Sequence, residues 1–73
     1  DARSIIRFVE ETYAGQAKVI DYTDGLSMSF DEWRFNVRMS NTEPVIRINV
    51  ESRGDDPLMR TKTKELLSLI EAQ

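Results

Sequence analysis

Apolar and polar residues alternate in three stretches of the chain, 26–30, 33–39 and 45–52. Strict alternation predicts β-strands, because successive side chains of a strand point to opposite faces of the sheet. The apolar segment 17–22 is predicted to be a further strand, and Asp24-Gly25 is a strong hairpin signal, because a primed turn needs a positive φ. The predicted core faces comprise Leu26, Met28 and Phe30; Trp33, Phe35, Val37 and Met39; and Ile46, Ile48 and Val50.

Both ends of the chain show helical spacing of apolar residues. Residues 4–13 predict a helix with Ser4 as N-cap and Gly15 just past its end. A second helix is predicted to open at Asp56 as N-cap, with Pro57 in the first helical position. The apolar faces are Ile5, Phe8, Val9 and Thr12 in the first helix, and Leu58, Met59, Leu66, Leu67, Leu69 and Ile70 in the second. Tyr13, Tyr22 and the methionines are also interpreted as packing residues.

The resulting order, α-β-β-β-β-α, predicts an α+β fold. It is a two-layer sandwich in which two helices cover the apolar face of a four-stranded antiparallel sheet and leave the polar face free. With 73 residues, the chain forms one domain with a small core. The N-terminus resembles neither an initiator nor a signal peptide, so we expect a piece of a longer protein.

The apolar faces also predict the register of the last two strands. Matching them pairs Met39 with Ile46, Val37 with Ile48 and Phe35 with Val50. On the polar face this register places Arg34 opposite Glu51, which is an ordinary cross-strand ion pair. It also places Arg38 opposite Arg47, a like-charge pair that is destabilising on its own. A bound anion between the two guanidinium groups would offset that repulsion.

The segment 38–47 concentrates groups that bind phosphate. Arg38 and Arg47 carry planar guanidinium groups that suit phosphate oxygens. The hydroxyls of Ser40 and Thr42 can each donate a hydrogen bond.

Two residues inside this segment shape the backbone. Asn41 tolerates a left-handed conformation, which lets successive backbone N–H groups converge on an anion. Glu43 precedes Pro44, is biased toward an extended shape, and is a candidate for supporting one of the arginines. The alternative interpretation remains open at this point, because Ser-Asn-Thr is common in turns and alternating arginines are common on solvated strand faces.

Composition narrows the possible functions. The net charge of −3 counts against a dedicated nucleic-acid binder. The chain has no histidine or cysteine, so the usual zinc, Cys–His and Ser–His–Asp sites cannot form within it. Absence of cysteine fits a reducing compartment such as the cytoplasm. No carboxylate cluster suggests a metal site, no catalytic residue is predicted, and no apolar run approaches the roughly 20 residues of a membrane span.

The run from Arg38 to Arg47 resembles the phosphate-binding loop of the α-D-phosphohexomutases, in their fourth, C-terminal domain. That family's pattern is Arg-x-Ser-(Asn or Gly)-Thr-Glu-Pro-x-x-Arg, and Asn41 is similar to the phosphomannomutase/phosphoglucomutase form. Asp24-Gly25, Trp33-Arg34 and Glu51 also resemble bacterial phosphomannomutases, and the likeness covers essentially the whole chain. The resemblance implies that Arg38, Ser40, Asn41 and Thr42 contact the substrate phosphate, with Arg47 a further, less secure candidate.

The resemblance also implies a four-domain parent enzyme of carbohydrate metabolism, linked to GDP-mannose biosynthesis. A phosphoserine in the first domain would donate its phosphoryl group, and the second domain would hold Mg²⁺. The third domain would contact sugar hydroxyls, and the fourth would grip the phosphate that is not transferred. The implied partners are the sugar phosphate and the other three domains, with no nucleic acid or membrane. The choice between mannose and glucose phosphates is not implied by this domain.

Two functions of other classes remain as alternatives. In a nucleic-acid-binding sheet module, Arg34, Arg38 and Arg47 would form a basic strip, although the acidic balance and the inward aromatic residues argue against it. The third possibility is a purely structural interaction domain.

Overall fold

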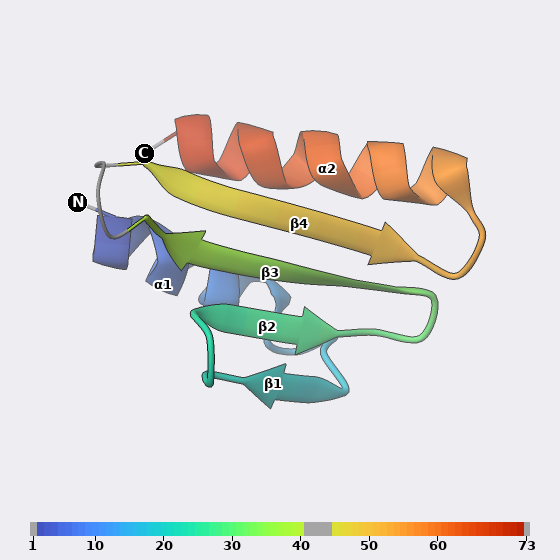
Figure 1. The fold of residues 1–73 in the computed structure, drawn as a ribbon, viewed down its shortest axis with the longest axis horizontal. Helices are drawn as coiled ribbons and strands as arrows, with labels where there is room; N and C mark the ends of the chain where they lie inside the picture. The colour runs from blue at the N-terminus through green and yellow to red at the C-terminus, as the bar shows by residue number, and fades with distance from the viewer. Residues whose placement is uncertain (1, 41–44, 73) are drawn as a thin grey trace.

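A computed structural model of the protein describes residues 2–40 and 45–72. Its elements follow the predicted order α-β-β-β-β-α (Figure 1). They are α1 (Ala2–Tyr13), β1 (Val19–Asp21), β2 (Leu26–Ser29), β3 (Trp33–Met39), β4 (Ile46–Ser52) and α2 (Asp56–Glu71). Both helices lie on one side of the sheet, so the predicted α+β sandwich is confirmed. No helix within the described residues is long and apolar enough to cross a membrane.

The four strands form an antiparallel meander in the order β1-β2-β3-β4. The pairing of β3 with β4 follows the predicted register: Met39 lies opposite Ile46, Val37 opposite Ile48 and Phe35 opposite Val50. On the polar face, Arg38 therefore lies opposite Arg47, and Arg34 opposite Glu51, as predicted.

The core lies between the apolar face of the sheet and the two helices. The most buried side chains, each no more than 8% exposed, are Leu26, Met28, Trp33, Phe35 and Val37 from the sheet, Val9 and Tyr13 from α1, and Leu66 from α2. Burying a large apolar side chain contributes about 1.5–3 kcal/mol. Because α1 and α2 share one core with the sheet, neither helix is an independent appendage.

Helix α1 packs through a face that shares Val9 with the predicted one but is rotated away from Phe8 and Thr12. Val9 and Tyr13 are buried and Ile6 packs against the core, whereas Phe8 and Thr12 are exposed. The helix begins at Ala2, so Ser4 lies inside it and is not the N-cap. Apolar residues at adjacent positions make two faces of this helix plausible, and contact with the sheet selects one of them.

Helix α2 starts one residue earlier than predicted. Its N-cap is Asp55, whose carboxylate accepts a hydrogen bond of 3.0 Å from the backbone N–H of Leu58. The prediction of Asp56 as N-cap was therefore wrong. The hydroxyl of Ser52 fixes the cap, since it accepts from the Asp55 N–H and donates to the Asp55 carbonyl.

Two packing predictions in the sheet region were also wrong. Tyr22 is 64% exposed and its hydroxyl donates to Glu10, while Met39 is 44% exposed. Strand β1 is also shorter than the predicted segment 17–22. The β1–β2 hairpin is confirmed; Gly25 adopts φ 74° whereas Asp24 has no positive φ, so the turn is not of the type I′ kind.

Tyr13 connects α1 to α2 across the core. Its ring contacts Trp33 and Phe35 with centroid separations of 5.6 and 5.5 Å, and its hydroxyl donates to Glu65 at 3.0 Å. Burial raises the pKa of Tyr13 above its ordinary value, and the neighbouring Glu65 carboxylate raises the pKa further.

We expect this arrangement to make the protein less stable in alkali. The unfolded chain loses the Tyr13 proton near pH 10 whereas the folded chain retains it, so stability falls as pH rises above about 10. In Tyr13→Phe this group no longer titrates, so urea unfolding should show a smaller loss of stability between about pH 9 and 11 than in the native chain. Equal losses in both proteins would contradict the assignment.

Candidate functional site

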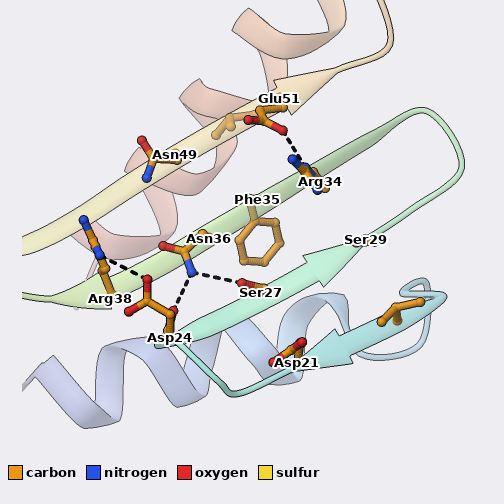
Figure 2. Close-up of a pocket in the computed structure, with 12 residues that line it drawn as sticks. Asp21, Asp24, Ser27, Ser29, Arg34, Phe35, Asn36, Arg38, Asn49 and Glu51 are labelled. Atoms are coloured by element: carbon orange, nitrogen blue, oxygen red, sulfur yellow. Dashed lines mark hydrogen bonds and ion pairs between the residues drawn. The ribbon is translucent and has the colours of Figure 1, made fainter.

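The candidate site lies where β3 and β4 bring Arg38 and Arg47 side by side. In an antiparallel sheet, directly opposite residues have Cα atoms about 4.5–5.5 Å apart, so the two side chains leave the sheet as neighbours. The alternation that buries Val37 and Phe35 sends Arg38 to the opposite, polar face. Figure 2 views that face, with the helices on the far side of the sheet.

Arg38 is partly paired within the described part of the chain. Its Nη1 lies 3.1 Å from the Oδ2 of Asp24, at the β1–β2 turn (Figure 2). Its Nε is buried and has no hydrogen-bond partner among residues 2–40 and 45–72. An unsatisfied buried donor costs about 1–3 kcal/mol, more for a charged group. This N–H is therefore a donor with capacity for an additional acceptor.

The repulsion between Arg38 and Arg47 is therefore offset in part by a carboxylate of the chain itself, in addition to the anion that the register suggested. The carboxylate of Asp24 offsets part of the repulsion from the Arg38 side, whereas the Arg47 side chain has no ion pair or hydrogen bond among the described residues. Sequence analysis missed Asp24, which it assigned a local role at a turn. The available signal was the β2–β3 register: Leu26 lies opposite Val37, which brings the preceding turn next to Arg38.

The β1–β2 turn is fixed against the sheet by close backbone contacts. A Cβ on Gly25 would lie 2.6 Å from the Arg38 Cβ and 2.6 Å from the Val37 carbonyl oxygen. The side-chain amide of Asn36 donates to the Asp24 carbonyl at 2.6 Å and to the Ser27 hydroxyl at 3.0 Å. The backbone of Asp24 is therefore held beside Arg38.

Ser40 closes the strand pairing next to the site. Its backbone N–H donates to the Val45 carbonyl at 3.0 Å, directly beyond the last paired residues of β3 and β4. A hollow of about 400 Å³ lies here, lined by Asp24, Gly25, Arg38, Met39, Ser40 and Arg47. Three of the predicted phosphate-binding residues are therefore gathered around one hollow, whereas Asn41, Thr42 and Glu43 lie outside the described residues.

A second, larger hollow of about 690 Å³ extends along the polar face of the sheet. Polar residues of its lining include Asp21, Asn36, Asn49 and the ion-paired Arg34 and Glu51. The Arg34 Nε lies 2.5 Å from a Glu51 carboxylate oxygen, which confirms the predicted ion pair. Both side chains are more than 60% exposed, so the pair contributes about 0–1 kcal/mol to stability. The Arg34 guanidinium is therefore paired with Glu51, and it does not belong to the Arg38–Arg47 row.

Asp21, another acidic residue that lines this hollow, accepts hydrogen bonds from the neighbouring Thr23. Hydrogen bonds from Thr23 lower the pKa of the Asp21 carboxyl, and the Thr23 backbone N–H donates to Asp21 at 2.7 Å. Among residues 2–40 and 45–72, no group of three or more carboxylates could hold a metal ion.

Comparison with known proteins decides the family. The sequence model for the C-terminal domain of phosphoglucomutase/phosphomannomutase matches residues 2–68. The chain belongs to this family. This phosphoglucomutase/phosphomannomutase domain is 64% identical over 62 residues to a phosphomannomutase of Salmonella montevideo, covering 85% of this chain and 14% of that protein.

Two further relatives extend the likeness. A phosphomannomutase of Escherichia coli K12 is 57% identical over 65 residues, covering 89% of this chain and 14% of that protein. A protein of Xanthomonas campestris strain B100 described as phosphohexose mutases is 49% identical over 70 residues, covering 96% of this chain and 16% of that protein. The phosphoglucomutase/phosphomannomutase domain thus spans about a seventh of the length of these relatives.

Gly25 provides a test of how the turn positions Asp24 in this phosphoglucomutase/phosphomannomutase domain. Gly25→Ala should destabilise the fold by backbone strain of about 1–2 kcal/mol and by a steric penalty of about 1–3 kcal/mol. Gly54→Ala is the matched control, because Gly54 has a similar φ of 71° but nothing within 4 Å of the new Cβ. Urea unfolding should show the larger loss for Gly25→Ala. Equal losses would mean that the turn does not pack tightly on Arg38.

Proposed function

We propose that the chain is the substrate-phosphate-binding domain of a phosphomannomutase. In this proposal Arg38, Ser40, Asn41 and Thr42 contact the phosphate, and Arg47 adds a second positive charge. The observation that carries the proposal is the row in which Arg38 faces Arg47 while the buried Nε of Arg38 has no partner among the described residues. Membership of the family and the similarity to phosphomannomutases support it further.

The chemistry of such a site suits phosphate recognition. Two guanidinium groups provide charge-assisted hydrogen bonds to phosphate oxygens, which are stronger than bonds between neutral groups. Hydroxyls from Ser40 and Thr42 would add neutral donors, and Glu43 would support one of the arginines. These groups recognise the phosphate itself and make no demand on the sugar attached to it.

The parent enzyme would interconvert mannose 6-phosphate and mannose 1-phosphate through a phosphoserine and a bisphosphorylated sugar. Three further domains would complete it, one of which would hold Mg²⁺; this chain alone is expected to be inactive. An alternative within the family is a phosphoglucomutase or an enzyme that acts on both sugars. This domain would bind the phosphate of either sugar in the same way.

The structure gives the nucleic-acid alternative less support than the phosphate site. Trp33 and Phe35 are 8% and 2% exposed and face the helices, so they cannot stack on bases from the polar face. Arg34, the third member of the proposed basic strip, is paired with Glu51. The strip is therefore shortened to the two arginines of the candidate site.

Titration of inorganic phosphate into the chain, followed by amide NMR, tests the proposal. We expect chemical-shift changes confined to residues 38–47 and neighbouring residues of the β1–β2 turn, with weak affinity that falls as salt is added. Arg38→Ala should weaken binding by about tenfold or more, because a hydrogen bond to a charged group contributes about 1.5–3 kcal/mol.

Arg34→Ala is the matched control for this experiment. It removes the same charge from the same strand and face, but Arg34 lies outside the row that contains Arg47. We expect it to change phosphate affinity far less than Arg38→Ala. Equal losses would indicate attraction by charge alone, and unmoved signals at millimolar phosphate would contradict a phosphate site in this chain.

A further inference from the structure

Asp24 occupies Nη1 of the Arg38 guanidinium, one of the donors that face the hollow of the candidate site. Its Oδ2 is 3.1 Å from the Arg38 Nη1, and both residues line the 400 Å³ hollow that also includes Ser40 and Arg47. A carboxylate at this place attracts the guanidinium and repels any other anion in the hollow. The Asp24 carboxylate and a bound phosphate would therefore compete for the Arg38 guanidinium.

The backbone of Asp24 is fixed, whereas its carboxylate has room to move. The Asn36 amide holds the Asp24 carbonyl, and the close approach of Gly25 to Arg38 leaves no space for a Cβ. By contrast, the Asp24 side chain is 71% exposed. The carboxylate can consequently rotate off the arginine into solvent without disturbing the turn.

The Asp24–Arg38 ion pair is weak enough for a phosphate to replace the carboxylate on Arg38. A solvent-exposed ion pair of this kind contributes about 0–1 kcal/mol, so a doubly charged phosphate that also contacts Arg47 can displace the carboxylate. In the meantime the pair limits the orientations open to the Arg38 side chain. The Arg38 Nε remains unpartnered among the described residues even with Asp24 bound, so one donor is ready before the exchange begins.

We propose that Asp24 is a positioning residue that competes with the substrate phosphate for Arg38. It holds the guanidinium in the hollow until phosphate arrives, then gives way, and its charge keeps the affinity for phosphate below what the two arginines would otherwise provide. This inference rests on the proposed phosphate-binding function. It gives Asp24 a role in setting the affinity for phosphate and in the release of phosphate.

Asp24→Asn and Glu51→Gln form the pair of variants that tests it. Each removes one carboxylate charge from an ion pair with an arginine of β3, but only Asp24 borders the Arg38–Arg47 hollow. In phosphate titrations followed by amide NMR, Asp24→Asn should bind about three- to fivefold more tightly than the native chain. Glu51→Gln should bind like the native chain.

The outcomes separate this inference from the proposed function. Equal tightening in both variants, or weaker binding by Asp24→Asn, overturns the competition while leaving phosphate binding in place. Absence of phosphate binding in the native chain and in both variants overturns both proposals.

A measurement on the native chain covers the case in which Asp24→Asn does not fold. The Asp24 carboxylate carbon and the Arg38 Nε–H are observed during the same phosphate titration. Competition requires both signals to move with one midpoint. Movement of the Arg38 signal with a stationary Asp24 carbon overturns the inference.

Discussion

The pairing of β3 with β4 is the constraint on which the rest of the structure depends. It runs over all seven residues of each strand, from Trp33 opposite Ser52 to Met39 opposite Ile46. On one face it supplies the side chains that the helices cover, and on the other it forms the row of Arg38 and Arg47. Because side chains alternate, a shift of one residue would exchange these faces. Core packing therefore fixes the candidate site as well as the fold.

Two electrostatic arrangements on this one sheet face have different consequences. Arg34 and Glu51 lie directly opposite each other, so each charge is satisfied by its strand neighbour. Arg38 lies opposite another arginine and obtains a carboxylate from the β1–β2 turn, on the other side of β2 in sequence. In the Arg34–Glu51 row the positive and negative charges balance. Among the described residues, the Arg38–Arg47 row retains a net positive charge, since one carboxylate stands beside two guanidinium groups, and this favours an anion.

The fold could be predicted from the sequence wherever the pattern of apolar residues was compatible with only one arrangement. Alternation over 33–39 and 45–52 fixed both the strands and their register, and hence the opposition of Arg38 and Arg47. In α1 the pattern had two solutions, because Ile5, Ile6, Phe8 and Val9 are all apolar, and contact with the sheet chose Ile6 and Val9. At α2, two consecutive aspartates could each cap the helix, and the Ser52 hydroxyl favours Asp55.

The contribution of Asp24 could not be predicted in the same way, because it depends on three-dimensional details that no residue pattern records. It requires the β2–β3 register, a positive φ at Gly25 and the amide of Asn36 on the Asp24 carbonyl. Backbone interactions also hold the residues of the site in place. Sheet pairing sets the spacing of the two arginines, the hairpin sets the place of the carboxylate, and the Ser40–Val45 hydrogen bond closes the strand ends. The arginines are thus positioned by backbone hydrogen bonding between the strands, whereas the Asp24 carboxylate is carried by an exposed side chain.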